Sequence, residues 1–456
     1  MKQVLLLATT TGYQIRSFGE AANALGVRLI FASDRCDQLD DPWWDRAIPV
    51  RFHEQSRSIE AITAACAPRP PDAVVAVGDR PTVLAAHLNA AFGLPGNSPT
   101  AAATARNKLA ARGAFHGAGL PSPDFRAVSL HDSPGAIARA MSYPAVIKPL
   151  ALSGSRGVMR VDDERAFVEA FSRLRALLQS PDVRIEHDDA HDRVLIETFV
   201  PGAEFAVEGV LTRGAFVPFA IFDKPDPLDG PFFEETIYVT PSRQSPPQQQ
   251  RIVDAVAAAA RALALSHGPV HAECRVNDRG VFVLEVAPRP IGGLCSKALR
   301  FSAPGAADDA SPASLEEVLL RHALGEDVSG YRREASASGV MMLPIPRRGV
   351  YRGVQGVDDA RAVEGIDDVR ITAKPDAVIV PLPEGRSYLG FLFAHGPTAV
   401  AVERSLRDAY ARLRFAIERE LMVMPGSRVS TTSSAAGRTR EATPRSRRRR
   451  NLPSGG

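Results

Sequence analysis

The sequence of 456 residues has only four cysteines and no long apolar segment. Cys36, Cys66, Cys274 and Cys295 are scattered, without the C-x-x-C spacing of a metal or redox site, which fits buried thiols in a reducing compartment. No run approaches the roughly 20 apolar residues that a membrane span needs. The short apolar run near the first residue lacks the core and cleavage site of a secretory signal. We therefore expect a cytoplasmic protein without a membrane partner.

The two common nucleotide-binding glycine motifs are missing as well. The spacing G-x-x-x-x-G-K-[ST] is not found, and the first apolar strand is not followed by G-x-G-x-x-G. Yet the stretch YPAVIKPLALSGSRGV, residues 143–158, reads as an apolar strand that ends near Lys148, with a loop of small residues at 153–157. A lysine beside such a loop suggests phosphate binding. Because the lysine precedes the loop, the sequence predicts a phosphate site of another kind.

The N-terminal residues, 1–97, alternate between apolar strands and helices. Strands are expected at 3–8, 27–33, 49–52 and 72–79, and helices at 15–26, 58–67 and 80–93. This alternation predicts a small doubly wound parallel sheet. Residues 9–12 follow the first strand at its carboxyl end, where such sheets bind ligands, although a plain turn explains them equally well.

The rest of the chain mixes helices and strands. A linker at 93–100 precedes two helices that carry Lys108, and β-rich runs broken by turns begin near residue 192, which suggests antiparallel pairing. Further helices are expected at 248–266, 312–324 and 399–423. The tail from 425 is basic and nearly free of large apolar residues, so we expect it to be disordered. Its arginine run could bind nucleic acid, but such short runs are more often nonspecific.

Two acids face each other in a predicted hairpin. The stretch HAECRVNDRGVFVLEVAPRP, residues 271–290, reads as two strands joined by a turn at 277–280, so that Glu273 pairs with Glu285. Carboxylates in such a pair lie only about 5 Å apart between their Cβ atoms and repel each other unless a cation lies between them. Mg²⁺ with phosphate oxygens is the natural candidate, and Arg289 can reach the same place as a donor to an anion. Two exposed acids beside a solvated arginine are the alternative.

The order of these features along the chain is informative. Lys108 on a helix, Lys148 before a Gly/Ser loop, the segment IETFVPGAEFAVEG at 196–209, and the two acids with Arg289 together resemble the ATP-grasp superfamily. The resemblance implies an ATP-grasp fold, of class α/β and α+β, in which ATP lies between two α+β subdomains. It divides the chain into a Rossmann-like pre-ATP-grasp domain (1–97), a subdomain with the glycine-rich lid (98–195), a catalytic subdomain (196–330), a C-terminal α+β domain (331–424) and the tail (425–456).

The resemblance also implies roles for single residues. Lys108 and Lys148 would contact the phosphates of ATP under a lid that contains Ser153, Gly154, Ser155 and Gly157. Glu197 would lie near the adenine, the backbone of Phe199 and Val200 would read the adenine edge, and Glu204 would hold the ribose. Glu273 and Glu285 would bind Mg²⁺ or Mn²⁺. Arg289 would bind the transferring phosphoryl or acyl-phosphate group, and with Lys148 it would be catalytic by offsetting charge.

Two positions depart from the pattern of the superfamily. Many members have asparagine two residues after the second acid, whereas this chain has Ala287. A second Mg²⁺ would therefore have fewer protein ligands. In the predicted substrate loop, 223–243, some relatives carry Glu-x-x-His, and this chain has Glu235-Thr-Ile-Tyr238. Glu234 or Glu235 would hold the ammonium group of the amine substrate, with Tyr238 beside it. Each of the two acids could equally be an ordered loop residue without a substrate contact.

The region 331–424 is similar to the C-terminal domain of L-amino acid ligase-like members. It implies an ATP-dependent carboxylate–amine ligase that forms an amide through an acyl phosphate, with small-molecule carboxylate and amine substrates such as amino acids. His271 is expected on the strand face of Glu273, at the substrate or as a structural histidine. The alternatives are an ATP-grasp carboxylase or purine-biosynthesis-type ligase, and a nucleotide-binding pseudoenzyme. Dimers are common in the family, so a homodimer is a further expectation.

Overall fold

The structure, a computed structural model, describes residues 1–9, 14–34, 47–305, 307 and 311–420. Most of the predicted ligand turn at 9–12, Cys36 and the tail from 425 therefore lie outside the described residues. Residues Met1–Arg419 form one compact unit. Within the described part of the chain, every helix is too short or too polar to cross a membrane.

The N-terminal residues form the parallel sheet that the sequence predicts. Its strands lie in the order β3-β2-β1-β4, and each neighbouring pair is parallel. The elements are β1 (Gln3–Ala8), α1 (Ile15–Ala24), β2 (Arg28–Ser33), β3 (Ile48–Pro49), α2 (Gln55–Cys66), β4 (Ala73–Val77) and α3 (Thr82–Phe92). Every residue of β1 is buried, as expected of a central strand. The strand predicted at 49–52 is wrong beyond Pro49: the Val50 N–H still donates to the Ser33 carbonyl at 2.9 Å, but the chain then turns, with the Arg51 carbonyl accepting from the Glu54 N–H at 2.9 Å.

A capping residue fixes the place of Lys108. Helix α4 (Pro99–Arg106) leads into α5 (Lys108–Gly117) with only Asn107 between them. The Asn107 backbone is extended, and its side chain accepts hydrogen bonds from the backbone N–H groups of Leu109 and Ala110. Lys108 is therefore the first residue of α5, and its backbone N–H donates to the Leu150 carbonyl at 2.9 Å. The start of this helix is thereby tied to the loop that follows Lys148.

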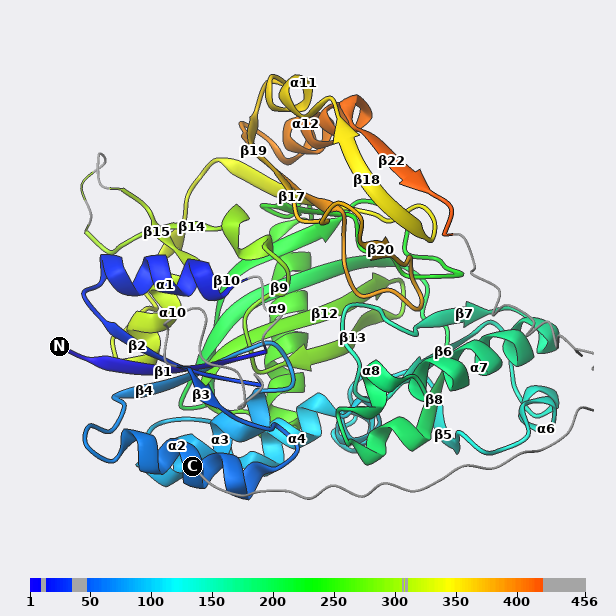
Figure 1. The fold of residues 1–456 in the computed structure, drawn as a ribbon, viewed down its shortest axis with the longest axis horizontal. Helices are drawn as coiled ribbons and strands as arrows, with labels where there is room; N and C mark the ends of the chain where they lie inside the picture. The colour runs from blue at the N-terminus through cyan, green and yellow to red at the C-terminus, as the bar shows by residue number, and fades with distance from the viewer. Residues whose placement is uncertain (10–13, 35–46, 306, 308–310, 421–456) are drawn as a thin grey trace, which may run out of the picture. The chain divides into compact units, whose positions relative to one another are not determined.

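The lid subdomain contains an antiparallel sheet of order β5-β8-β6-β7. Its elements are β5 (Phe125–Ser129), α6 (Pro134–Arg139), β6 (Ala145–Pro149), β7 (Met159–Val161), α7 (Glu164–Leu178), α8 (Pro181–Arg184), η1 (Asp189–Asp192) and β8 (Arg193–Thr198). Figure 1 shows α7 lying against this sheet, and Phe167, Phe171 and Leu174 of α7 are fully buried in the core. Lys148 is the next-to-last residue of β6, and the predicted lid loop, residues 150–158, connects β6 to β7.

An eight-stranded antiparallel sheet joins the catalytic and C-terminal parts of the chain (Figure 1). Its order is β13-β12-β9-β10-β11-β17-β21-β19. The strands are β9 (Ala203–Thr212), β10 (Ala215–Lys224), β11 (Ile237–Thr240), β12 (Gly268–Asn277), β13 (Gly280–Ala287), β17 (Ala337–Leu343), β19 (Ile366–Ile371) and β21 (Gly390–Gly396). The sheet runs on across the boundary predicted between 330 and 331, so the strands with the two acids share one sheet with three strands of the C-terminal part.

Three predicted helices have different bounds. Helix α9 (Pro246–Ala262) and helix α10 (Leu315–Ala323) are shorter than expected, and α10 starts where Ser314 and Glu317 form a capping box. The helix predicted at 399–423 is wrong in its second half: α12 (Ala399–Arg412) ends, and β22 (Arg414–Glu418) pairs with β18 (Gly349–Gln355). The remaining elements are η2 (Cys295–Ala298), β14 (Arg300–Ser302), β15 (Ala313–Ser314), β16 (Arg332–Arg333), α11 (Val357–Arg361) and β20 (Val378–Ile379).

Candidate active site

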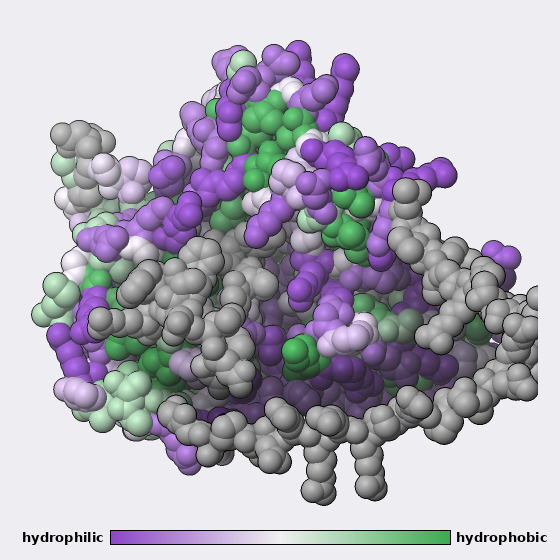
Figure 2. All heavy atoms as spheres, in the orientation of Figure 1, coloured by the Kyte–Doolittle hydropathy of each residue, from purple (hydrophilic) through white to green (hydrophobic). Residues whose placement is uncertain are grey.

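The predicted acid pair is confirmed by the register of β12 and β13. Glu273 lies directly opposite Glu285, and the turn lies at Asn277–Gly280 as expected. The side chains of both acids are partly exposed, Glu273 by 22% and Glu285 by 28%. Figure 2 shows a mostly hydrophilic face with a recess near its centre, and Figure 1 places β12 and β13 behind that position. Both acids are therefore partly accessible to solvent.

Lys108 meets the second of these acids. Its Nζ lies 3.0 Å from Glu285 Oε2 and donates to the Leu152 carbonyl at 2.8 Å. The lysine thus links an acid of β13 to the backbone of the lid loop. This is the position that a group contacting phosphates between the acids and the lid would need.

Lys148 is held by a buried ion-pair network. Its Nζ lies 2.6 Å from Glu197 Oε2, and the Nε of Arg112 donates to the other oxygen of Glu197 at 2.8 Å. Arg112 also donates to the carbonyls of Val283 and Leu284 on β13. Burial lowers the pKa of Lys148 more than its ion pair with Glu197 raises it. The sequence reasoning placed Glu197 beside the adenine and missed both this contact and Arg112.

The acid stability of this network can be predicted from Glu197. Burial opposes ionisation, but Lys148 and Arg112 outweigh it and lower the Glu197 pKa from 4.5 to about 2. The folded state then binds fewer protons than the unfolded state, so the stabilisation is present above pH 4.5 and is lost as the pH falls toward 2. Its size is on the order of 3 kcal/mol.

Urea unfolding of the wild type and of Glu197→Gln at pH 7 and pH 3 measures this effect. We expect the difference between their free energies of unfolding to be large at pH 7 and much smaller at pH 3. The control is Glu169→Gln, which changes an exposed acid on α7. A difference for Glu197→Gln that is the same at both pH values would contradict the assignment.

Counting only partners among the described residues, the hinge after β8 leaves one backbone donor and one backbone acceptor unpaired. The Phe199 N–H donates to the Pro144 carbonyl at 3.0 Å, and the Val200 carbonyl accepts from Arg275 Nη1 at 2.8 Å. Half of the backbone groups expected to read adenine are therefore engaged within the protein. Among the described residues, the Phe199 carbonyl and the Val200 N–H have no partner, and one acceptor beside one donor still matches an adenine edge.

Glu204 lies in a row of charges across three strands. In the strand register it stands opposite Lys224 of β10 on one side and Arg275 of β12 on the other. Lys224 Nζ lies 2.8 Å from Glu204 Oε1, and Arg275 Nε lies 2.9 Å from Glu204 Oε2. The predicted ribose acid is thus buried and paired twice. Neither cation was recognised in the sequence.

Lys224 also contacts two further acids. Its Nζ lies 2.9 Å from Glu235 and 2.9 Å from Glu273, and 4.8 Å from the centre of the Tyr238 ring. We call Glu204, Glu235 and Glu273 the acid cluster; one oxygen from each lies within 4.8 Å of the others. Burial and the neighbouring Glu273 raise the pKa of Glu235 to about 7, although Lys224 opposes this shift. The hydroxyl of Tyr238 is 3.4 Å from Glu273.

The carboxylates of Glu234 and Glu235 lie in different surroundings. Glu235 joins the acid cluster, whereas the Glu234 carboxylate accepts from the backbone of Ile345, and burial raises the pKa of Glu234. His271 lies where the strand pattern predicts. Its Nδ1 is 2.6 Å from Glu208 and its Nε2 is 3.6 Å from Glu273. Burial alone would lower the pKa of His271, but the hydrogen bonds to these two acids raise it to about 9.

Arg289 is held by a residue from the N-terminal sheet. Its Nε and Nη2 donate to the two carboxylate oxygens of Asp79 at 2.9 Å and 3.2 Å. Asp79 follows β4, at the carboxyl end of the parallel sheet. This bidentate pair fixes the plane of the guanidinium group that the sequence assigns to a phosphoryl group. Asp79 was not among the predicted residues.

The lid loop is attached to the C-terminal part of the chain. The Gly157 N–H donates to the Pro383 carbonyl at 2.8 Å, and Arg156 Nε donates to the Glu384 carbonyl at 2.9 Å. The carboxylate of Glu384 pairs with Arg173 of α7 at 2.9 Å and 3.0 Å. Gly157 has φ +75°, and a Cβ atom there would lie 2.9 Å from Leu174, so only glycine fits this end of the loop.

Removing the Glu384 carboxylate should loosen the lid. Because the Arg173–Glu384 pair is partly exposed, we expect Glu384→Ala to raise the KM for ATP only about threefold and to speed proteolytic cleavage in the lid loop. Glu169→Ala, which removes the partner of exposed Arg165 on the same helix, is the matched control. Equal cleavage rates in Glu384→Ala, Glu169→Ala and wild type would rule out this attachment.

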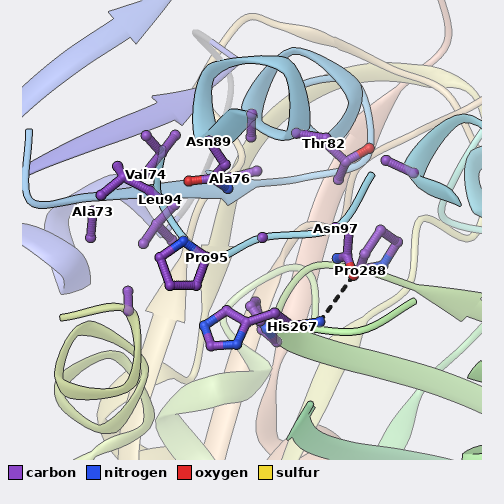
Figure 3. A pocket seen from close by; sticks show the side chains of 18 of the residues that line it. Ala73, Val74, Ala76, Thr82, Asn89, Leu94, Pro95, Asn97, His267 and Pro288 are labelled. Atoms are coloured by element: carbon purple, nitrogen blue, oxygen red, sulfur yellow. Dashed lines mark hydrogen bonds between the residues drawn. The ribbon is translucent and has the colours of Figure 1, made fainter. Parts of the chain in front are cut away.

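A small pocket lies where the N-terminal sheet meets the catalytic subdomain (Figure 3). Its volume is about 60 Å³, and its wall includes Val74, Asn97, His267 and Pro288. The Asn97 side chain accepts from the backbone N–H of His267 at 3.1 Å, the dashed line of Figure 3. The predicted site residues are not part of this wall, so the pocket marks the joint between domains that brings Asp79 to Arg289.

Three family models match the chain. An ATP-grasp N-terminal domain matches residues 19–96, an ATP-grasp domain matches 141–298, and an L-amino acid ligase C-terminal domain 2 matches 341–418. The ATP-grasp match contains Lys148, the lid loop, the acid cluster and Arg289. The third match covers β21, α12 and β22 and begins inside β17, at its last three residues, 341–343.

Curated relatives share part of their length with this chain. An uncharacterized protein of Sinorhizobium fredii is 27% identical over 330 residues, which cover 72% of this chain and 64% of that protein. Alanine–anticapsin ligase of Bacillus amyloliquefaciens is 27% identical over 218 residues, 44% of each chain. Carnosine synthase 1 of Gallus gallus is 30% identical over 235 residues, 49% of this chain and 25% of that one. The match thus spans less than two thirds of each of these relatives.

Solved structures extend the likeness over most of the chain. The L-amino acid ligase of Bacillus licheniformis has a TM-score of 0.75 and 25% identity, and the match covers 92% of this chain and 99% of that one. N5-carboxyaminoimidazole ribonucleotide synthetase of Thermotoga maritima, with a TM-score of 0.63 and 16% identity over 92% of this chain and 100% of that one, shares the fold. The chain therefore belongs to the ATP-grasp superfamily and carries the type of C-terminal domain found in L-amino acid ligases.

Proposed function

We propose that the protein is an ATP-dependent ligase that joins a carboxylate to an amine, with amino acids as substrates. The observation that carries this proposal is the convergence of two facing acids with cations from other elements. Glu273 and Glu285 are paired, Lys108 lies 3.0 Å from Glu285, and Lys224 lies 2.9 Å from Glu273. Membership of the ATP-grasp superfamily supports the same interpretation.

The residues fit ATP with a divalent cation. Carboxylate oxygens are the ligands that Mg²⁺ and Mn²⁺ prefer, and Glu273 and Glu285 offer them from directly paired positions. A cation there would also remove the repulsion between the two acids. When bound, Mg²⁺ would neutralise charge on the phosphate oxygens. Ala287 supplies no ligand oxygen, so in this proposal the two acids carry the protein's share of the coordination.

The proposed reaction has two steps. A substrate carboxylate oxygen attacks the γ-phosphorus of ATP, and the bond from that phosphorus to the bridging oxygen breaks. The products of this step are an acyl phosphate and ADP. The ammonium group of the amine substrate first gives a proton to solvent. Its nitrogen then attacks the acyl carbon and loses a second proton, and the bond between that carbon and the phosphate oxygen breaks to release inorganic phosphate. Lys148 and Arg289 would offset the charge on the transferring group, and Glu235 would hold the ammonium form of the incoming amine.

Amino acids are proposed as substrates on two grounds. The match to an L-amino acid ligase C-terminal domain covers 341–418, and β17, whose last three residues begin this match, pairs with β11 inside the predicted substrate loop. The names alanine–anticapsin ligase and L-amino acid ligase both refer to amino acids. The match to this domain also favours a ligase over a carboxylase or a purine-biosynthesis-type enzyme, with which the chain shares the fold.

A screen of amino-acid pairs tests the proposal. Each pair is incubated with the full chain, ATP and Mg²⁺, ADP formation is followed, and mass spectrometry identifies products. We expect ADP and an amide of the summed mass less water for at least one pair. Binding of ATP without ADP release from any mixture of acids and amines would instead support a nucleotide-binding protein without turnover.

A further inference from the structure

Lys224 is enclosed by acids that serve three different purposes in the proposed function. Glu204 is assigned to the ribose, Glu235 to the amine substrate and Glu273 to the metal ion. The Lys224 Nζ lies 2.8 Å, 2.9 Å and 2.9 Å from their oxygens, so each acid accepts one contact from the same ammonium group. The Lys224 side chain is only 3% exposed. An ammonium group has three donors, and this site uses all of them.

The strands explain why the lysine is fixed there. Lys224 is the last residue of β10 and stands opposite Glu204 in the β9–β10 register. On the other side of Glu204, Arg275 occupies the same register position of β12. Arg275 Nε contacts only the second oxygen of Glu204, which leaves Glu204 Oε1 to Lys224. Glu235 and Glu273 then approach the same ammonium group from the substrate loop and from β12.

Without this ammonium group, the acid cluster would have the form of a cation site. One oxygen from each of its three acids lies within 4.8 Å of the others. Oxygens so placed can surround a divalent ion with bond lengths of roughly 2.1–2.5 Å. Nothing else in the described surroundings contacts all three acids. Lys224 therefore stands in the place that a divalent cation would take.

We propose that Lys224 is a positioning residue that uses its own ammonium group to hold the acid cluster together and to exclude a divalent cation from it. In the protein without nucleotide, a divalent ion would then meet Glu273 paired with Lys224 and Glu285 paired with Lys108, so the metal ion would bind well only together with ATP. The assignment of the three acids to different ligands rests on the proposed function. The exclusion of a cation from the cluster rests on the geometry alone.

Mn²⁺ binding without nucleotide tests the proposal and needs no turnover. Free Mn²⁺ is titrated by electron paramagnetic resonance with the full-length wild type, with Lys224→Met and with the double variant Lys224→Met/Glu235→Gln. We expect Lys224→Met to bind one Mn²⁺ at least about tenfold more tightly than wild type, because three acids lose their shared cation. The double variant should lose this gain, since one ligand is removed. Lys374→Met, at an exposed position, should behave as wild type.

Two results would overturn the proposal. One is a Lys224→Met protein that is folded by circular dichroism and gains no affinity for Mn²⁺, or whose gain persists in the double variant. The other needs only the wild type, in case Lys224→Met does not fold. Wild type should bind Mn²⁺ at least about tenfold more weakly alone than with a non-hydrolysable ATP analogue. Equally tight binding in both conditions would show that Lys224 excludes nothing. None of these results depends on finding the amine or acid substrate.

Discussion

Replacing Lys148 by methionine is expected to lower ATP-dependent turnover by about a thousandfold while the protein stays folded. Lys148 is 7% exposed and is the last charged residue before the lid loop that would cover the phosphates. Methionine keeps most of the buried volume and removes the charge. Glu197 loses one partner but keeps Arg112 at 2.8 Å, so the charge of the buried carboxylate is still compensated. The loss should therefore be in catalysis and ATP binding.

This result is measured as ADP release with an amino-acid pair found in the screen, and as the Kd for ATP by calorimetry. Circular dichroism and thermal unfolding show whether the variant is folded. Exposed Lys374→Met is the matched control for removal of a lysine, and it should retain full turnover. A folded Lys148→Met protein with turnover near that of wild type would refute the assignment of Lys148 to the active site.

Replacing Glu285 by glutamine is expected to reduce turnover by about a hundredfold to a thousandfold with little loss of stability. The Glu285 side chain is 28% exposed, and its ion pair is the one with Lys108. Removal of such a partly exposed pair costs no more than about 1 kcal/mol of unfolding free energy. Mg²⁺, in contrast, would lose one of its two paired ligands.

Glu273→Gln is the informative comparison for Glu285→Gln. Glu273 contacts Lys224 and approaches His271, so its loss should lower both turnover and the unfolding temperature. The two variants thus separate a proposed metal ligand with few structural contacts, Glu285, from one that also pairs with buried Lys224, Glu273. Turnover is measured at several Mg²⁺ concentrations, and unfolding by thermal denaturation. If Glu285→Gln keeps its turnover at every Mg²⁺ concentration, the predicted metal pair is wrong.

The sequence predicted best those features that depend on neighbouring residues. The turn at Asn277–Gly280 sets the register of its hairpin, so the pairing of Glu273 with Glu285 could be read directly. The parallel N-terminal sheet followed from strands and helices in alternation. At residues 399–423 local reasoning failed, because a helical pattern runs straight into RFAIE, whose alternation fits the edge strand β22.

The partners of the site residues could not be read in the same way. Arg112 reaches Glu197 and Asp79 reaches Arg289 only because separate subdomains pack together, and no local pattern encodes such packing. Two signals were nevertheless present. Lys224 precedes a proline at the end of an apolar strand, as Lys148 does, and Arg112 lies four residues after Lys108, on the same face of its helix. Both signals become meaningful only when the site is already suspected.

The continuity of the large sheet has a consequence for engineering this enzyme class. Strand β11 lies within the predicted substrate loop, 223–243, and its residues Ile237–Thr240 pair with β17 of the C-terminal part. A C-terminal domain taken from a relative would have to form the same β11–β17 pairing, because an unpaired sheet edge promotes aggregation. Chimeras in which the loop and the terminal domain are exchanged together keep the β11–β17 pairing. The predicted substrate loop and the terminal domain are thus parts of one continuous sheet.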